Sequence, residues 1–370
     1  MTGGVSPRDA DTDADTDADV MLMSGPDIAD AVWRKAFCQL YRVRRPCVPL
    51  GDIIHWRAVI DALGVGSHLD RDLAYVPSGY FYQTHTQAPT RSEMDGACRD
   101  AHRYGARWVL YPVVRQPAAA ADAESGGAVE LPWFVSAEYE VRRGVDEDLR
   151  DQLGGARTRE IARLSRRAAG QVTWDASTGE PAPDVLAAFD RLHRLNLDRY
   201  GHRHNHFARP ILAELIRSPL RDDLCVFRHV PAGGGDPVQA VLALWSREEA
   251  LLHLQVQGID HARVAPAVNL YATMLYRIFG WGVANGIRRF DLGRGAYAAK
   301  LNLGANRFQV VSNLLIPVAP GAEPDDLTEL RKAAAHAVDA AVDQLRTTVL
   351  RRGAAAHIEL PQLPEQWREQ

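Results

Sequence analysis

The chain has 370 residues, which exceeds one average domain of about 150 residues, so we expect two or so structural units. Hydrophobic residues make up 46% and charged residues 24%, which excludes wholesale disorder and indicates a globular chain with a real core. The formal charge is −4, but six aspartates against Arg8 give residues 1–26 a charge of −5 and leave the body at +1. A body so near neutrality does not indicate a nucleic-acid binder, although local basic patches are compatible with it.

The cysteines exclude two small-domain classes. They form neither a CxxC pair nor a regular spacing, so no zinc ribbon or disulfide framework is expected of Cys38, Cys47, Cys98 and Cys225. No apolar run reaches about 18 residues, and the N-terminus is acidic where a signal peptide is basic and then apolar. We therefore expect a cytoplasmic protein without membrane insertion.

The first half begins with the repeat DTDADTDAD, which predicts a solvating, disordered tail over residues 1–26. An amphipathic segment starts at Asp27. A helix then ends at Gly105, apolar residues 108–114 follow, and residues 116–130 form a loop rich in Ala, Gly and Ser. Residues 132–143 alternate like a strand, and an Arg-rich helix over residues 146–170 is interrupted near Gly154 and Gly155.

The second half has a clearer order. A helix with Asp184 as its N-cap is expected up to Tyr200, and a second near residues 210–216. The runs LCVFRHV, QAVLALWSR and ALLHLQVQGID, split by turn signals, predict a three-stranded meander. A long helix then ends at Gly286, which suits a left-handed C-cap, and strands RRFDLG and RFQVVSNLLIPV flank a short helix before a last helix at residues 325–351.

This element order is that of the GNAT acyltransferase fold, and the segment FDLGRGAYAAKLNLGA at residues 290–305 resembles the Fem-type branch of the GNAT superfamily. The resemblance covers residues 130–318. It implies an α+β fold with two GNAT-like lobes, a mixed central sheet flanked by helices, and a C-terminal helix. The segments HRYGARWVLYP and VANGIRRFDLG echo each other, either by chance or as traces of two lobes. We expect a tail at 1–26, lobes at 27–180 and 181–320, and a C-terminal helix and tail at 321–370.

The resemblance also implies a reaction. We expect an N-acyltransferase in which a small-molecule amine directly attacks an acyl thioester, supplied by acyl-coenzyme A or a carrier protein. One alternative is a Fem-type aminoacyltransferase that uses aminoacyl-tRNA in secondary metabolism or cell-wall synthesis. A second is a catalytically silent GNAT-like binding module.

Four residues are the candidate catalytic groups. Lys300 matches the family lysine that contacts the donor or the developing oxyanion, and lysine is rare here, the others being Lys35 and Lys332. Tyr297 could donate a proton to the leaving group. His253 could act as general base from a polar strand face that it is expected to share with Gln255 and Gln257, and Asp291 is a second candidate base.

The donor-binding candidates surround the Gly-Arg-Gly turn and the start of the long helix. Gly293 and Gly295 let backbone approach a ligand closely, and Arg294 could clamp a phosphate or carboxylate. The glycine-rich pyrophosphate loop of coenzyme A-dependent relatives is replaced by DHARVAPAVN, so only the helix N-terminus near Ala267 and Asn269 offers its dipole to an anion. Gln257 is the last residue of this set. Because the glycines are missing, aminoacyl-tRNA and carrier-protein thioesters are candidate donors beside coenzyme A.

Two further clusters are weaker signals. His202, His204 and His206 alternate in GHRHNH, but no carboxylate or cysteine completes a site, and we expect no metal. The Arg-rich helix could follow the phosphates of RNA or a cofactor, although a solvated face is the simpler interpretation of Arg157, Arg159, Arg163, Arg166 and Arg167.

Overall fold

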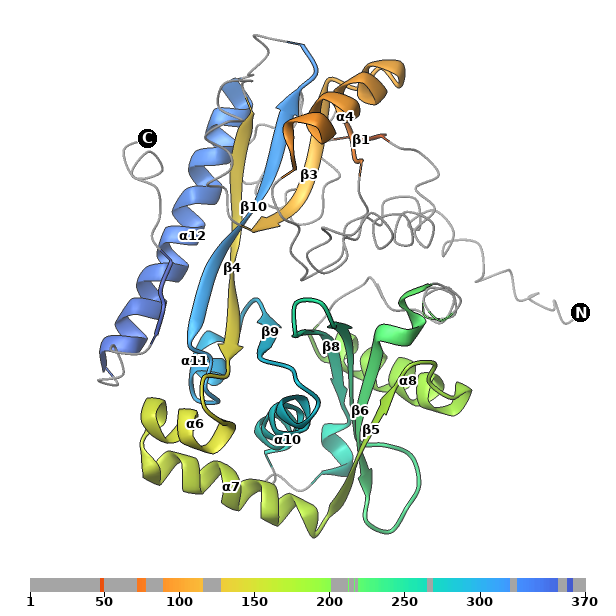
Figure 1. Ribbon diagram of the computed structural model, residues 1–370, viewed down its shortest axis with the longest axis vertical. Coiled ribbons are helices and arrows are strands. Elements are labelled where there is room, and N and C mark those ends of the chain that lie inside the picture. The colour runs from red at the N-terminus through yellow and green to blue at the C-terminus, as the bar shows by residue number, and fades with distance from the viewer. Residues whose placement is uncertain are drawn as a thin grey trace, which may run out of the picture.

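The computed structural model of the protein shows one mixed sheet with helices packed against it (Figure 1). The described residues are 47–49, 72–77, 89–115, 128–200, 212, 216, 219–264, 269–319, 325–351 and 358–361. The predictions for the acidic tail, the amphipathic segment after Asp27 and most of residues 210–216 lie outside them.

Ten described strands form the sheet in the order β1-β2-β3-β10-β4-β9-β8-β7-β6-β5. In chain order they are β1 (Cys47–Pro49), β2 (Leu73–Tyr75), β3 (Trp108–Arg115), β4 (Val129–Glu140), β5 (Val172–Thr178), β6 (Leu224–Pro231), β7 (Gln239–Ser246), β8 (Leu251–Ile259), β9 (Arg289–Gly293) and β10 (Arg307–Pro317).

The α-helices come between and after these strands. They are α4 (Arg91–Arg103), α6 (Val145–Leu153), α7 (Gly155–Ala169), α8 (Pro183–Tyr200), α10 (Leu270–Ala284), α11 (Tyr297–Leu301) and α12 (Asp325–Arg351), with short 3-10 turns at Pro219–Asp223 and His261–Arg263. No helix in the described part of the chain is both long and apolar enough to span a lipid bilayer.

The centre of the sheet is built symmetrically from the two halves of the sequence. The long strands β4 and β10 pair antiparallel to each other. Outward from them, β10 meets β3 and β4 meets β9, again antiparallel, and each of these is followed by a parallel neighbour, β2 or β8. Among the described residues, each parallel pair is connected through one α-helix, α4 or α10. The predicted mixed sheet of two related lobes, with a C-terminal helix, is confirmed, whereas the boundary at residue 180 stays a prediction.

The predicted echo between the halves is a shared helix ending. Gly105 and Gly286 both adopt left-handed backbone, with φ of 67° and 86°. In both cases the next amide bonds back over the helix end, Ala106 N to Ala101 O and Ile287 N to Gly282 O, each at 2.9 Å. This is the Schellman ending, which only glycine adopts without strain. The predicted left-handed ending at Gly286 is confirmed, although the C-cap residue itself is Asn285.

The start of α8 differs from the sequence prediction. The helix begins at Pro183, so Asp184 lies inside its first turn and is not the N-cap. Proline suits that position because its fixed φ is helical and the first turn has no use for its missing N–H.

The two faces of the sheet around β8 are covered by different helices. Val241, Ala243 and Leu254 belong to the large core cluster that includes residues of α10 and α12, and Figure 1 shows α12 running along β4. On the other face Gly258 lies directly against α8, where an added Cβ would approach the carbonyl carbon of Leu192 to 2.3 Å. Glycine at this position therefore permits the close packing of α8 on β8.

Candidate active site

The candidate site lies where β8 and β9 separate. These parallel strands pair only from Leu251 opposite Arg289 to His253 opposite Asp291. Beyond that point β8 continues to Ile259, paired only with β7. His253 and Asp291 therefore mark the fork of the sheet, beside the edge of β8 that β9 leaves unpaired.

His253 and Asp291 form a buried pair. Their side chains are 0% and 1% exposed, and His253 Nδ1 lies 3.2 Å from Asp291 Oδ2. Asp291 Oδ1 accepts hydrogen bonds from Ser136 Oγ at 3.0 Å and from the Gly293 amide at 2.9 Å. An ionised carboxylate can only accept, so this arrangement places the proton of a neutral His253 on Nδ1. His253 Nε2 has no hydrogen-bond partner among the described residues and carries the lone pair.

The Lys300 side chain contacts the backbone of the turn that follows β9. Its ammonium donates to the carbonyls of Gly293 and Arg294 at 2.8 and 2.7 Å, and the residue is 4% exposed. Burial lowers the pKa of Lys300 to about 7, opposed by the charge of Asp291 and aided by that of Arg294. The contacts shown are those of a clamp on the turn, and the oxyanion role stays a prediction.

The turn itself is strongly curved. Gly293, Gly295 and Ala296 all have positive φ, at 67°, 70° and 48°. The Gly293 amide is engaged by Asp291, whereas no atom lies within 4 Å of the position that a Cβ of Gly295 would occupy. Gly295 is thus the glycine of this pair that leaves room for the predicted close approach of a ligand.

Tyr297 and Arg294 have structural contacts in this state. Tyr297 donates from its hydroxyl to the Val135 carbonyl at 2.6 Å, and burial raises the pKa of its phenol. The Arg294 guanidinium lies 5.8 Å from the centre of the Phe134 ring. The leaving-group role of Tyr297 and the anion-clamping role of Arg294 stay predictions.

The prediction that His253, Gln255 and Gln257 share one polar face of β8 is wrong. Gln255 has no opposite residue in β7, because Leu254 pairs with Ala243 and Val256 with Leu242. This bulge breaks the alternation on which the expectation rested. His253 opposes Leu244 and Gln257 opposes Val241, three positions apart on β7, so the two lie on opposite faces. His253 shares the face of Gly258 and α8, and Gln257 that of α10.

The start of α10 agrees with the sequence prediction in part. Asn269 is its N-cap, and its side chain accepts from the Ala272 amide at 3.0 Å. Ala267 lies outside the described residues. The Asn269 oxygen already occupies one of the free amides, so an anion at this end would use the others.

Three polar residues that support the predicted site residues through hydrogen bonds were not predicted from the sequence. Ser136 lies within an apolar strand and contacts Asp291 155 positions away, so no local pattern marks it. His229 and Gln239 are buried partners of each other, and Gln239 also contacts Gln257. These two flank the PAGGGD turn, and the hairpin register alone could have placed them opposite each other.

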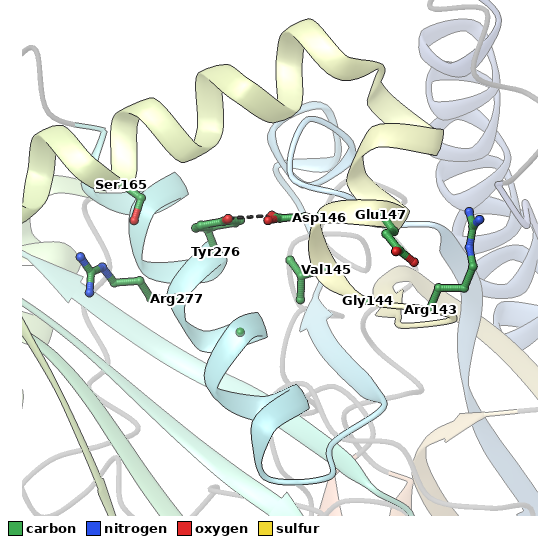
Figure 2. Close-up of a pocket in the computed structure, with 9 residues that line it drawn as sticks. Arg143, Gly144, Val145, Asp146, Glu147, Ser165, Tyr276 and Arg277 are labelled. Atoms are coloured by element: carbon green, nitrogen blue, oxygen red, sulfur yellow. Dashed lines mark hydrogen bonds between the residues drawn. The ribbon is translucent and has the colours of Figure 1, made fainter.

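A surface hollow of about 650 Å³ lies elsewhere, between α6, α7 and α10 (Figure 2). Its lining includes Ser165, Arg277 and Tyr276, which donates to Asp146 Oδ1 at 2.7 Å. Burial and Asp146 raise the pKa of Tyr276 to about 12. None of the predicted site residues lines it, so we place the candidate chemistry at the fork.

Metal ligands are absent from the part of the chain that the structure describes. No group of three or more His, Cys, Asp or Glu side chains there could hold an ion. The histidines at positions 202, 204 and 206 lie outside the described residues.

Comparison with known protein families finds one matching family model. Residues 156–301 match the acetyltransferase (GNAT) domain, which covers α7 to α11 and therefore the fork. No curated protein sequence is significantly similar to the chain.

Several solved structures are similar to the chain. The structure of L-PGS from Bacillus licheniformis has a TM-score of 0.50 at 11% identity, over 70% of this chain and 81% of that one. FemX has a TM-score of 0.46 at 10% identity, over 62% and 74% of the two chains. A tandem GNAT protein from the clavulanic acid biosynthesis pathway has a TM-score of 0.39 at 11% identity, over 63% and 70%. Together with the family model, the first of these confirms the predicted GNAT fold.

Proposed function

Because residues 156–301 are a GNAT-type acetyltransferase domain, we propose that the protein is an N-acyltransferase that moves an acyl group from a thioester to an amine. The observation that carries the proposal is the fork of β8 and β9 with the buried His253–Asp291 pair at its apex. The open edge of β8 offers backbone groups to an extended donor, and the pair offers a proton acceptor beside it.

In the proposed reaction the amine nitrogen attacks the thioester carbonyl carbon. A C–N bond forms, the C–S bond breaks, and the thiol leaves. The proton of the attacking nitrogen passes to His253 Nε2, directly or through one water molecule, and from there to the departing thiolate. Asp291 keeps the Nδ1–H tautomer and stabilises the imidazolium that forms, so it acts as a positioning residue.

The turn after β9 supports the negative oxygen of the tetrahedral intermediate in this proposal. Lys300 donates to the carbonyls of Gly293 and Arg294. In a trans peptide the N–H points away from the C=O, so the Arg294 amide faces away from the lysine, whereas the Gly295 amide is bonded to the Tyr297 phenol. Preorganised amides of this kind commonly contribute about 3 kcal/mol to a transition state.

The first test is transfer by the purified full-length chain from acetyl-coenzyme A to a panel of amines. The expected result is amine-dependent release of free thiol, with an acylated product identified by mass spectrometry. Absence of thiol release with every amine and with longer acyl-coenzyme A donors would overturn the thioester proposal.

One observation favours a second candidate, transfer from aminoacyl-tRNA. The outward face of α7 carries four exposed arginines at helical spacing, Arg159, Arg163, Arg166 and Arg167, of which Arg163 is paired with Glu160. Such a stripe provides phosphate contacts for RNA. Product formation from charged tRNA that RNase abolishes would establish this candidate, and inactivity with both donors would favour a silent binding module.

A further inference from the structure

A chain of hydrogen bonds crosses three strands on the α10 face of the sheet. His229 Nδ1 lies 2.8 Å from Gln239 Oε1, and Gln239 Nε2 donates to Gln257 Oε1 at 3.4 Å. His229 and Gln239 are 0% exposed, whereas Gln257 is only half-buried. The chain therefore leads from the protein interior to the surface beside the fork.

The direction of this chain follows from the chemistry of its ends. Gln239 Oε1 can only accept, so the proton of His229 lies on Nδ1 and its buried Nε2, which has no hydrogen-bond partner among the described residues, is a lone pair. The reverse direction would bury an unpaired N–H at Nε2, and buried unpaired donors are the rarer case. Burial and the charge of Arg277 lower the pKa of His229 to about 4, so the ring is neutral near pH 7.

This direction fixes the orientation of the Gln257 amide. Its oxygen is occupied by Gln239, so its NH2 group faces away from the chain, and no described residue accepts from it. Gln257 lies on the part of β8 that β9 does not cover. Ile259, two residues further on the same face, shares a core cluster with Leu270 at the start of α10. Gln257 is therefore two residues from the position on β8 that packs against the start of α10.

We propose that the Gln257 amide donates to an acceptor oxygen of the acyl donor, and that His229 and Gln239 are positioning residues that keep its NH2 group outward. This inference rests on the proposed acyl transfer and identifies a donor-specificity residue within it. The oxygen recognised is an amide carbonyl or a phosphate, both of which coenzyme A carries.

The binding experiment uses calorimetry with acetyl-coenzyme A and with S-acetylpantetheine, which has the amides and lacks the phosphates. Gln257→Met keeps the length of the side chain and removes the donor. Its dissociation constant for acetyl-coenzyme A should rise roughly 10-fold, with KM rising in step and kcat changed less than about 3-fold, as loss of one hydrogen bond predicts. A matching rise for S-acetylpantetheine identifies the carbonyl, and a rise for acetyl-coenzyme A alone identifies the phosphate.

The positioning role is tested by Gln239→Glu, which leaves an acceptor at position 239 and removes the donor. The Gln257 amide should turn its NH2 inward, so KM should rise as in Gln257→Met, and the double variant should be no worse than either single one. Gln152→Met is the matched control, because it removes another buried glutamine bond, to Ala305 O at 2.7 Å, and should lower only the melting temperature.

Nitrogen-15 NMR of His229 in the unmodified protein tests the direction without any variant. The expected spectrum shows a neutral ring protonated on Nδ1 at pH 7. Protonation on Nε2, or unchanged donor binding by Gln257→Met, would overturn the inference while leaving acyl transfer intact. Failure of the unmodified protein to bind acetyl-coenzyme A would overturn the thioester proposal and, with it, the proposed role of Gln257 in donor binding.

Discussion

At the scale of single residues, the proposed chemistry at the fork depends on the hydrogen bonds that orient the Asp291 carboxylate. The carboxylate accepts from Ser136 and from the Gly293 amide on one oxygen and faces His253 with the other. Three buried donors around one carboxylate fix its orientation. A histidine supported in this way has a defined tautomer before any substrate arrives.

Asp291→Asn should lower the rate of transfer by about 100-fold or more, because the amide no longer enforces the Nδ1–H tautomer or stabilises the imidazolium. The measurement is kcat/KM with the amine that gives the highest rate. Ser136→Ala is the control, since it removes one bond and leaves the charge, and it should cost less than about 10-fold. Wild-type kinetics in Asp291→Asn would exclude the pair from the reaction.

Burial changes the effect expected from removing Lys300, which the sequence analysis predicted as a contact of the oxyanion. An exposed oxyanion contact would leave stability unaffected when removed. The structure instead shows two hydrogen bonds from the buried Lys300 side chain to backbone carbonyls of the turn. Removing the side chain should therefore lower stability as well as transfer, because unpaired buried carbonyls are costly.

The stability contributed by Lys300 should depend on pH in a defined direction. Its pKa falls from an ordinary 10.5 to about 7 in the folded protein, so between these values the unfolded chain binds more protons than the folded one. The free energy of unfolding of the wild type should therefore rise with pH from about 7 towards 10.5, relative to Lys300→Met. Urea unfolding of both proteins at several pH values measures the difference. Lys332→Met, which removes a lysine paired with Glu329 on α12, is the control, and a flat difference for Lys300→Met would contradict the assignment.

At the scale of elements, a glycine in β8 and a glycine in α10 have different roles. The first permits two elements to pack closely, and the second lies in a helix without any such contact. A Cβ at Gly258 would lie 2.3 to 2.6 Å from backbone atoms of Leu192 and His193, which cannot move without shifting α8. Gly280 is also inside an element, yet no atom lies within 4 Å of its absent Cβ. The two positions therefore respond oppositely to the same substitution.

Gly258→Ala should destabilise the protein by about 1–3 kcal/mol or more, because the added methyl group overpacks a backbone contact. Gly280→Ala should be neutral or stabilise by up to about 1 kcal/mol, since alanine is the better helix former. Melting temperatures of both variants provide the comparison. Equal melting temperatures would show that α8 does not pack on β8 as closely as described.

At the scale of the whole molecule, the two lobes exchange their central strands. β4, from the first half of the chain, lies between β9 and β10 of the second half. A fragment that begins after β4 would expose the edges of both neighbours and lose the core residues Val135, Ala137 and Tyr139. The halves are consequently one folding unit in the sheet, whatever boundary separates their sequences.

A fragment of residues 142–370 should lack a cooperative thermal transition, because nothing replaces β4 in the sheet. Coexpression with residues 1–141 should restore a folded, copurifying complex, since the missing strand is then supplied in trans. Circular dichroism and copurification are the measurements. A stable fragment 142–370 that melts cooperatively alone would contradict the central role of β4.

Much of the fold was open to prediction from the sequence because its signals are local. Periodicity placed the meander β6 to β8 and the helices α10 and α12, and glycine placed the shared helix ending after α4 and α10. The segment around Gly293 and Lys300 was also marked, since a rare lysine beside two glycines stands out in the chain.

The sequence by itself thus determined the elements, their order and the segment that carries the candidate site. Only the tertiary structure decided which side chains meet there: the bulge at Gln255 that separates His253 from Gln257, the contact of Ser136 with Asp291, and the insertion of β4 between β9 and β10. The physical reason is that the Ser136–Asp291 contact and the place of β4 join segments more than 100 residues apart, with β4 at residues 129–140 and β9 at 289–293, whereas the bulge is set by how β7 and β8 pair. Such contacts leave no periodic trace in either segment.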